Sequence, residues 1–384
     1  MEKLTIINAR AVTPDKVLED ATVTLCDGLI SAVSQGQPAA SCGEIIDASG
    51  QYLLPGFIDL HCDAVEKGVE PRPQTFFPAD VALAELDKTL AACGVTTMYH
   101  SLSFAEQEIG IRSNRVASSV LRKVNEMQDN FRVKTRVHSR FEITDKSAVP
   151  ILKQLIAEDQ IDLFSFMDHS PGQGQFKTIG SFKNYYGKVY KKSDSELDEL
   201  LEKKGRVCQI EARQQIEELL TLCREKRISI ASHDDDSPEK ICWLKDRNIA
   251  LSEFPVNLET ARAAREHGIR TLFGSPNVFR GASQASNLSA REAIAAGYGD
   301  ILCSDYAPMT LLHAVFTLVQ LGMKTLPEAV QMTSLNPARA VGIDAETGSL
   351  EPGKAADLVL VGNGSHFPRI QRTFVNGREV FRTC

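Results

Sequence analysis

The chain has 384 residues, of which 43% are hydrophobic and 24% are charged, and its formal net charge is −7. This is the composition of an ordinary globular protein, and its acidic balance gives no reason to expect nucleic-acid or membrane binding. No apolar run reaches membrane-spanning length, and the N-terminus lacks the apolar core of a signal peptide. The 9 cysteines are scattered without CxxC spacing, so we expect reduced thiols and a cytoplasmic protein.

Both ends of the chain are predicted to be rich in β-strands. Short apolar runs broken by turns such as Asp27-Gly28 fill residues 1–54. Residues 350–384 contain further runs, and Asn376-Gly377 between two of them is a strong hairpin signal. Because the middle of the chain has a different pattern, we expect the two ends to meet and form one small β domain.

Residues 55–349 alternate between short apolar strands and helical stretches, which is typical of parallel βαβ units. The candidate strands are 56–61, 95–101, 136–143, 161–168, 228–233, 249–254, 270–275 and 300–305. This number of units favours an α/β fold of the (β/α)₈ TIM-barrel type. The alternative is an open parallel sheet, but no glycine-rich dinucleotide fingerprint supports it.

Histidine and carboxylate side chains recur where the predicted strands end. The candidates for metal ligands are His61, Asp63, Glu142, His169, His233 and Asp305. In an extended strand His61 and Asp63 point the same way, with Asp59 one step behind them. The carboxyl ends of barrel strands lie on one face, so we expect these groups to converge.

Each of these residues also has a simpler interpretation. A single histidine at a strand end is more often structural, and Asp234 can cap the helix that starts near Pro238. However, burying several carboxylates together is costly unless cations neutralise them. The conjunction therefore predicts a centre of two divalent metal ions, with Glu142 placed to bridge them.

Several segments resemble the amidohydrolase superfamily across the whole chain. They are Pro55-Gly56-Phe57-Ile58-Asp59-Leu60-His61, Asn336-Pro337-Ala338-Arg339-Ala340 and the run 348–360. Most members of that superfamily begin with His-x-His and bridge their metals with a carboxylated lysine. This chain has Asp63 for the second histidine and Glu142 where a bridging group is wanted. The resemblance implies a barrel plus a small β-sandwich domain made from both chain ends.

Asp63 and Glu142 match one phosphate-cleaving branch of the superfamily better than they match its other members. The segments Pro71-Arg72-Pro73, 167–173, 231–235 and 303–306 are similar to diphosphatases of phosphonate catabolism. The resemblance implies metal-dependent hydrolysis of a ribose 5-triphosphate to the 5-phosphate and diphosphate. The resemblance to the superfamily as a whole implies Asp305 as the proton acceptor, where a carboxylate can also reach the bridging water, and a homodimer. Mixed oxygen and nitrogen ligands accept zinc, manganese or iron, of which we expect zinc first.

Other residues are candidates for orienting groups or for binding the triphosphate. His138 and Asp234 are placed to orient ligands or to donate a proton to the leaving phosphate. Cations in loops or at strand ends are candidates for phosphate contacts: Arg72, Arg140, Arg280 and Lys177. Residues 172–207 form a long excursion that is either a lid over a phosphorylated sugar or a surface insertion.

Two other functions are compatible with the sequence. The same metal centre permits hydrolysis of a C–N bond in a cyclic amide or an amino-purine, because fold does not fix chemistry. Apolar walls and amide-like donors around the metals would favour that reaction, whereas several arginines favour phosphate. A catalytically silent binding protein is the second alternative, and it predicts lost ligands, whereas each expected ligand position holds a competent residue.

Overall fold

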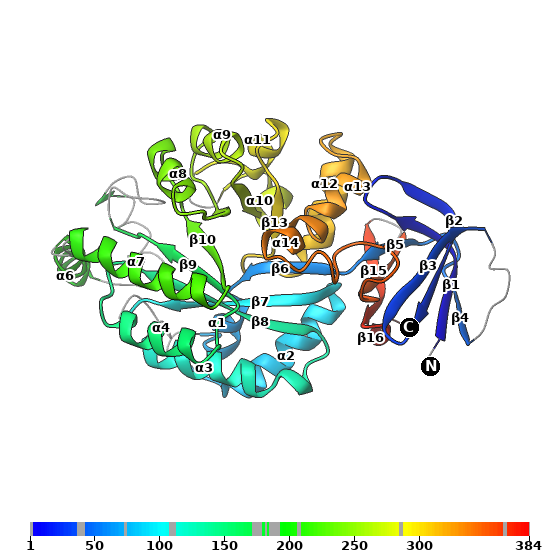
Figure 1. Cartoon of the computed structure of the whole chain (residues 1–384), viewed down its shortest axis with the longest axis horizontal. Coiled ribbons are helices and arrows are strands. Elements are labelled where there is room, and N and C mark those ends of the chain that lie inside the picture. Colours follow the sequence, from blue (N-terminus) through cyan, green and yellow to red (C-terminus); the bar gives the residue numbers. More distant parts are fainter. Residues whose placement is uncertain are drawn as a thin grey trace.

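The structure is a computed structural model that describes residues 3–36, 43–72, 75–106, 113–170, 179–180, 183, 193–205, 209–283, 287–363 and 367–383. It contains a parallel barrel surrounded by helices and a separate sheet built from both chain ends (Figure 1). The fold class predicted from the sequence is therefore confirmed. No described helix has the length and apolar character needed to cross a membrane.

The barrel has eight parallel strands, each hydrogen-bonded to the next in chain order. They are β6 (Phe57–Cys62), β7 (Val95–Phe104), β8 (Lys134–Glu142), β9 (Leu163–Met167), β10 (Ser229–His233), β11 (Leu251–Glu253), β12 (Arg270–Gly274) and β13 (Ile301–Cys303). A single parallel bridge from Cys62 to Asp305 joins the first and last strands. Two backbone hydrogen bonds at the same level brace this seam, from Asp305 to His61 (2.9 Å) and from Asp63 to Asp305 (2.8 Å).

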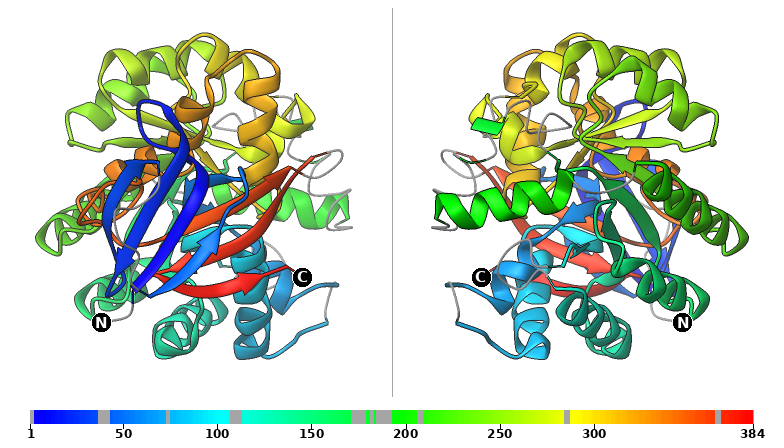
Figure 2. Two further views of the ribbon diagram at one scale, coloured as in Figure 1. Left: turned by 90° about the vertical axis from the view of Figure 1, so that its right-hand side faces the viewer. Right: turned by 90° about the vertical axis from the view of Figure 1, so that its left-hand side faces the viewer.

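Helices surround the barrel and bury the outward-facing side chains of its strands (Figures 1 and 2). Those of the described residues are α1 (Ala64–Val69), α2 (Ala79–Ala92), α3 (Asn114–Glu126), α4 (Ala148–Ala157), α6 (Asp194–Gly205), α7 (Gln209–Glu225), α8 (Pro238–Lys245), α9 (Leu258–Glu266), α10 (Ser275–Arg280), α11 (Ala290–Ala295), α12 (Thr310–Gln320), α13 (Leu326–Gln331) and α14 (Leu335–Ala340), with a 3₁₀ turn at Gln128–Asn130.

The two chain ends share one hydrogen-bonded sheet beside the barrel (Figure 2). Its strands are β1 (Lys3–Val12), β2 (Val17–Cys26), β3 (Leu29–Gln35), β4 (Glu44–Asp47), β5 (Tyr52–Pro55), β14 (Leu358–Asn363), β15 (Pro368–Val375) and β16 (Arg378–Arg382). Antiparallel pairing of β14 with β5 joins the C-terminal strands to the N-terminal ones. Ile6, Leu53, Leu358 and Phe374 lie in one apolar core, so the two ends stabilise each other as predicted.

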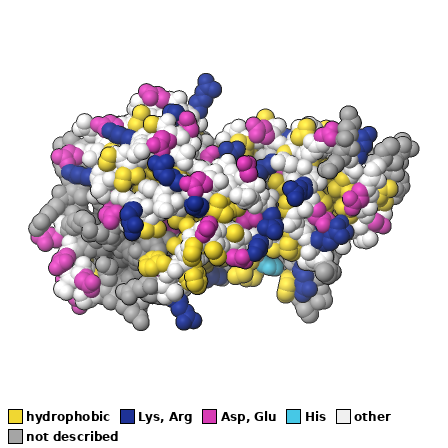
Figure 3. Space-filling view, turned by 90° about the horizontal axis from the view of Figure 1, so that it is seen from below, with side chains coloured by type: hydrophobic (Ala, Val, Ile, Leu, Met, Phe, Trp, Pro, Cys, Tyr) yellow, Lys and Arg dark blue, Asp and Glu magenta, His cyan; other side chains and the backbone are white. Residues whose placement is uncertain are grey.

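Basic and acidic side chains are interspersed over the face seen from below, and hydrophobic side chains gather near its middle (Figure 3). This mixture agrees with the composition, because no field of a single sign covers that face.

A β-bulge in β6 sets the direction of the first candidate ligand. Asp59 lies opposite Met98 of β7, and Cys62 lies opposite His100, so the register shifts between these pairs. Two residues of β6, 60–61, therefore face a single residue of β7. An extra residue of this kind sends two consecutive side chains to the same side of a strand.

Both side chains of the bulge point into the barrel. Leu60 packs in the apolar cluster inside the barrel, and His61 reaches Glu253 on the opposite wall. Asp59 turns away, and its Oδ1 accepts hydrogen bonds from the backbone amides of Ser304 (3.0 Å) and His61 (3.3 Å). The expectation that Asp59 stands one step behind His61 on the same face is therefore wrong, because the bulge breaks the alternation.

Candidate metal centre

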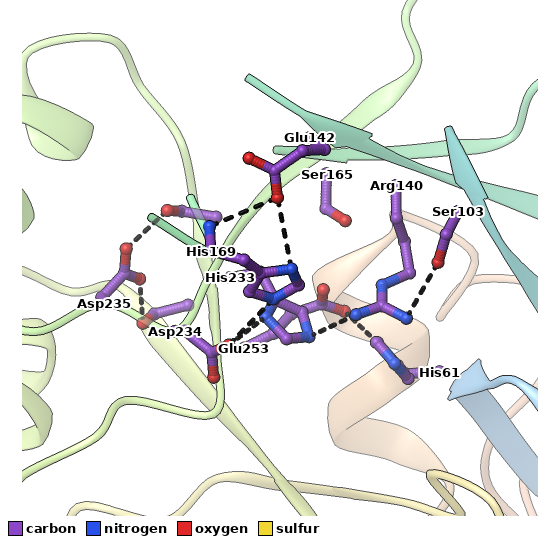
Figure 4. Close-up of polar contacts among 12 residues, drawn as sticks. His61, Ser103, Arg140, Glu142, Ser165, His169, His233, Asp234, Asp235 and Glu253 are labelled. Carbon is purple, nitrogen blue, oxygen red and sulfur yellow. Dashed lines mark hydrogen bonds and ion pairs between the residues drawn. The ribbon is translucent and has the colours of Figure 1, made fainter. Parts of the chain in front are cut away.

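His61, His138 and Glu253 form the first of two groups of side chains that can hold a metal ion. They come from β6, β8 and β11, are all buried, and offer ligand atoms within 4.8 Å of one another. Nδ1 of His61 lies 3.3 Å from Oε1 of Glu253 (Figure 4), and Nε2 of His138 lies 3.7 Å from its Oε2. Oε2 of Glu253 accepts no hydrogen bond from the described residues. A buried carboxylate oxygen in this state suits a cation.

His169, His233 and Asp234 form the second group, which is also buried and also has ligand atoms within 4.8 Å. Oδ2 of Asp234 lies 3.0 Å from Nδ1 of His233 and 3.5 Å from Nε2 of His169 (Figure 4). The two groups are neighbours, because the ring centroids of His61 and His233 are 5.4 Å apart. Imidazole and carboxylate donors together suit zinc, manganese or iron.

Asp234 takes part in this group rather than in the helix that follows. It adopts a left-handed conformation with φ +54, which Asp tolerates better than most residues. The cap of α8 is Ser237, whose side chain accepts a hydrogen bond from the amide of Lys240. Burial acts to raise the pKa of Asp234, but His233 and His169 outweigh it and lower that pKa. The interpretation of Asp234 as a helix cap is therefore wrong.

Glu142 and Arg140 lie on the same face of β8 and reach the second group (Figure 4). Oε2 of Glu142 is 3.2 Å from Nδ1 of His169, and its Oε1 accepts a hydrogen bond from Thr144 (2.7 Å). Nη2 of Arg140 donates to Nε2 of His233 (3.1 Å). Arg140 as a whole residue is only 5% exposed. A buried guanidinium thus stands against the histidines, where it can meet an anion.

The pKa of Asp305 shows most clearly that carboxylates are crowded together at this site. This pKa is raised to about 8, chiefly by burial and also by the neighbouring carboxylates of Asp63 and Asp234, while Arg140 acts to lower it. Such a raised pKa means that the carboxylate form is poorly compensated by the side chains alone. Bound divalent cations would supply the missing compensation, so the donor set and its electrostatics both fit metal ions.

His138 is held as a neutral imidazole. Its Nδ1 lies 3.0 Å from the carbonyl of Leu60, which can only accept, so Nδ1 carries the proton. The hydroxyl of Ser165 then donates to Nε2 over 2.8 Å. Burial lowers the pKa of His138 to about 3. The Nδ1 proton is directed at the Leu60 carbonyl and the Nε2 lone pair accepts from Ser165, so His138 has no proton directed at a leaving phosphate. This geometry favours the orienting role.

The remaining predicted residues lie apart from this cluster or outside the described ranges. The side chains of Arg72, in the loop after α1, and Arg280, at the end of α10, are exposed. Lys177 and most of 172–207 are not among the described residues. Glu253 was not among the candidate ligands predicted from the sequence. The signal that could have identified it is a charged residue at the end of a predicted buried strand.

Comparisons with known proteins agree with this architecture. A family model described as the amidohydrolase family matches residues 193–380. The chain is 32% identical, over 98% of its length and 100% of the relative's, to the α-D-ribose 1-methylphosphonate 5-triphosphate diphosphatase of Escherichia coli strain K12. It is 25% identical to the imidazolonepropionase of Porphyromonas gingivalis strain W83, over 94% of this chain and 89% of that one.

Solved structures show the same fold at low sequence identity. The N-acetylglucosamine-6-phosphate deacetylase of Pasteurella multocida superposes with a TM-score of 0.65 at 15% identity, over 98% of this chain and 99% of that one. A dihydropyrimidinase from Brevibacillus agri gives 0.61 at 14% identity, over 99% and 95%. Together with the full-length relative and the buried strand-end cluster, these matches show that the chain belongs to the amidohydrolase family of hydrolases.

Proposed function

We propose that this protein is a metal-dependent diphosphatase that hydrolyses α-D-ribose 1-methylphosphonate 5-triphosphate to the 5-phosphate and diphosphate, in phosphonate catabolism. The full-length relative at 32% identity carries that activity in its name. The structural observation that carries the proposal is the buried guanidinium of Arg140, which faces the histidine cluster. A fixed cation at this point suits a substrate whose reacting group is anionic.

The proposed ligands of two divalent ions, zinc first, are His61, Asp63, Glu142, His169, His233 and Asp305, to which the structure adds Glu253. His138 and Asp234 either join them or orient them. When bound, the metals supply Lewis acidity toward phosphoryl oxygens and lower the pKa of a water molecule. The barrel excludes water from most of these side chains, since the histidines, Glu142 and Glu253 are buried, whereas Asp63 and Asp305 are partly exposed.

The protein's own side chains bind the phosphates of the substrate and accept a proton from water. Arg140 binds a phosphoryl oxygen of the triphosphate and offsets the charge that develops there. Asp305 accepts a proton from the attacking water. Water adds to the phosphorus of the first phosphate, the bond from that phosphorus to the bridging oxygen breaks, and this oxygen leaves with the diphosphate. Arg72, Arg280 and Lys177 are proposed to hold the outer phosphates.

The test is an assay of the metal-loaded protein with the ribose triphosphate phosphonate and, in parallel, a nucleoside triphosphate. We expect stoichiometric diphosphate from the first substrate and its loss after chelation. Release of ammonia or of a carboxylate from a cyclic amide, with no diphosphate from either triphosphate, would overturn the proposal in favour of C–N hydrolysis. The resemblance to the superfamily further implies a homodimer, which sedimentation of the loaded protein tests. The scattered cysteines favour a cytoplasmic location.

A further inference from the structure

Phe254 follows β11 in a backbone conformation that a bulky side chain rarely adopts. Its φ is +53, in the left-handed region. Asp234 after β10 and Asp305 after β13 have similar values, +54 and +59. Asp tolerates this region because its short polar side chain can bond locally, whereas phenylalanine has no such compensation. Strain of this kind persists only where the surroundings over-determine it, and it gathers at functional sites.

The left-handed turn changes the face on which the aromatic ring lies. In a regular strand consecutive side chains point to opposite faces, and Glu253 already points into the barrel, where it contacts His61. Phe254 would therefore turn outward toward the helices. Instead its ring lies against two imidazoles inside. Its backbone amide still donates to the carbonyl of Leu272 (2.8 Å), so the turn preserves the ladder to β12.

The ring of Phe254 contacts one histidine from each of the two candidate metal groups. Its centroid is 4.9 Å from that of His61, with the planes at 90°, and 5.1 Å from that of His233, with the planes at 58°. The two imidazoles are themselves 5.4 Å apart. Three rings thus form a compact triangle, and a carbon ring competes for none of the nitrogen atoms that a metal requires.

We propose that Phe254 is a positioning residue that fixes the separation and the orientation of His61 and His233 for metal binding. This inference rests on the proposed metal centre. His61 comes from the first barrel strand and His233 from the fifth, so no local backbone connection fixes their relative placement. The phenyl ring makes that connection, and it shields one side of each imidazole from water.

The test uses the whole protein loaded with Co²⁺ and with Zn²⁺. Phe254→Leu keeps apolar bulk and removes the ring, while Phe254→Gly removes the ring and also relieves the left-handed strain. The matched control is Asn248→Gly, since Asn248 has the same φ of +53 in an exposed turn before β11. We measure metal affinity, the visible spectrum of bound Co²⁺, and the melting temperature of the chelated protein.

Both Phe254 variants are expected to bind metal about 10-fold or more weakly and to show an altered Co²⁺ spectrum, as for other groups that orient ligands. Asn248→Gly is expected to behave as the wild type. Wild-type affinity and spectrum in both Phe254 variants, with or without a change in melting temperature, would overturn the inference and leave the diphosphatase proposal standing. Conversely, a wild type that releases no diphosphate while both variants lose metal would overturn the diphosphatase proposal alone.

Discussion

Nδ1 of His61 lies 3.3 Å from Oε1 of Glu253, although 192 positions separate the two residues in the chain. The contact spans the barrel from its first strand to its sixth. Both side chains are almost fully buried, with 2% and 0% of their surfaces exposed. A carboxylate in this place is costly by itself, because burial removes its hydration without supplying a full counter-charge. It is therefore best explained by a cation that Glu253 helps to hold.

Replacing Glu253 tests that explanation. Glu253→Gln keeps the size of the side chain and removes its charge, so we expect metal affinity to fall by about 10- to 100-fold. Diphosphate release at limiting metal should fall in parallel. Glu259→Gln is the control, because Glu259 lies in the first turn of α9, away from the cluster. Equal metal content in the two variants after dialysis would argue against a role for Glu253 in metal binding.

Asp305→Asn removes the proposed base and is expected to leave the fold intact, so it distinguishes a catalytic effect from a structural one. Asparagine tolerates the left-handed φ of +59 at this position, so the backbone should be retained. Turnover should fall by about 10²- to 10⁴-fold, the usual contribution of a positioned base. The chelated variant should be at least as stable as the wild type, because a carboxylate crowded by Asp63 and Asp234 is removed. Normal hydrolysis by metal-loaded Asp305→Asn would exclude Asp305 as the base.

The sequence predicted the barrel, the joining of the two chain ends and most members of the buried cluster. Strand-end reading works because parallel strands deliver their carboxyl ends to one face. It failed where the backbone departs from regular geometry. The bulge at 60–61 reverses Asp59, and the left-handed turn at Phe254 brings an aromatic ring inside. These departures depend on pairing with distant strands, so no local pattern in the sequence reveals them.

The contribution of Arg140 to phosphate binding is tested by Arg140→Lys. Lysine keeps the charge but loses the planar fork that grips two oxygens, so the substitution is not conservative at such a site. We expect kcat/KM for the triphosphate to fall by about 10- to 100-fold, which corresponds to about 1.5–3 kcal/mol for charged hydrogen bonds. Metal content is measured alongside, since Arg140 also donates to His233.

Arg136→Lys is the matched control for Arg140, because it changes the same residue type on the same strand. Arg136 pairs with Asp162 over 3.0 Å, and its side chain is 47% exposed. We expect its kinetics to match the wild type. A fall in kcat/KM that is equal in the two variants would show that β8, rather than the guanidinium of Arg140, is responsible.

The pH dependence of stability should report on His100, which lies on β7 opposite Cys62 and belongs to neither metal group. Burial lowers its pKa to about 4, and its Nδ1 has no hydrogen-bond partner among the described residues. The unfolded chain has a histidine pKa near 6.5, so it takes up a proton that the native protein excludes as the pH falls below that value. Stability is therefore lost on acidification, by about 2 kcal/mol between pH 8 and pH 5.

His100→Leu removes the titrating group and keeps the site apolar. Denaturant unfolding of chelated wild type and variant at pH 8 and pH 5 measures the difference, because contributions from the other histidines are common to both proteins and cancel. The variant should gain about 2 kcal/mol relative to the wild type as the pH falls from 8 to 5. If the two proteins lose stability in parallel, the acid sensitivity arises from other groups, of which the buried His138, with its pKa lowered to about 3, is the next to test.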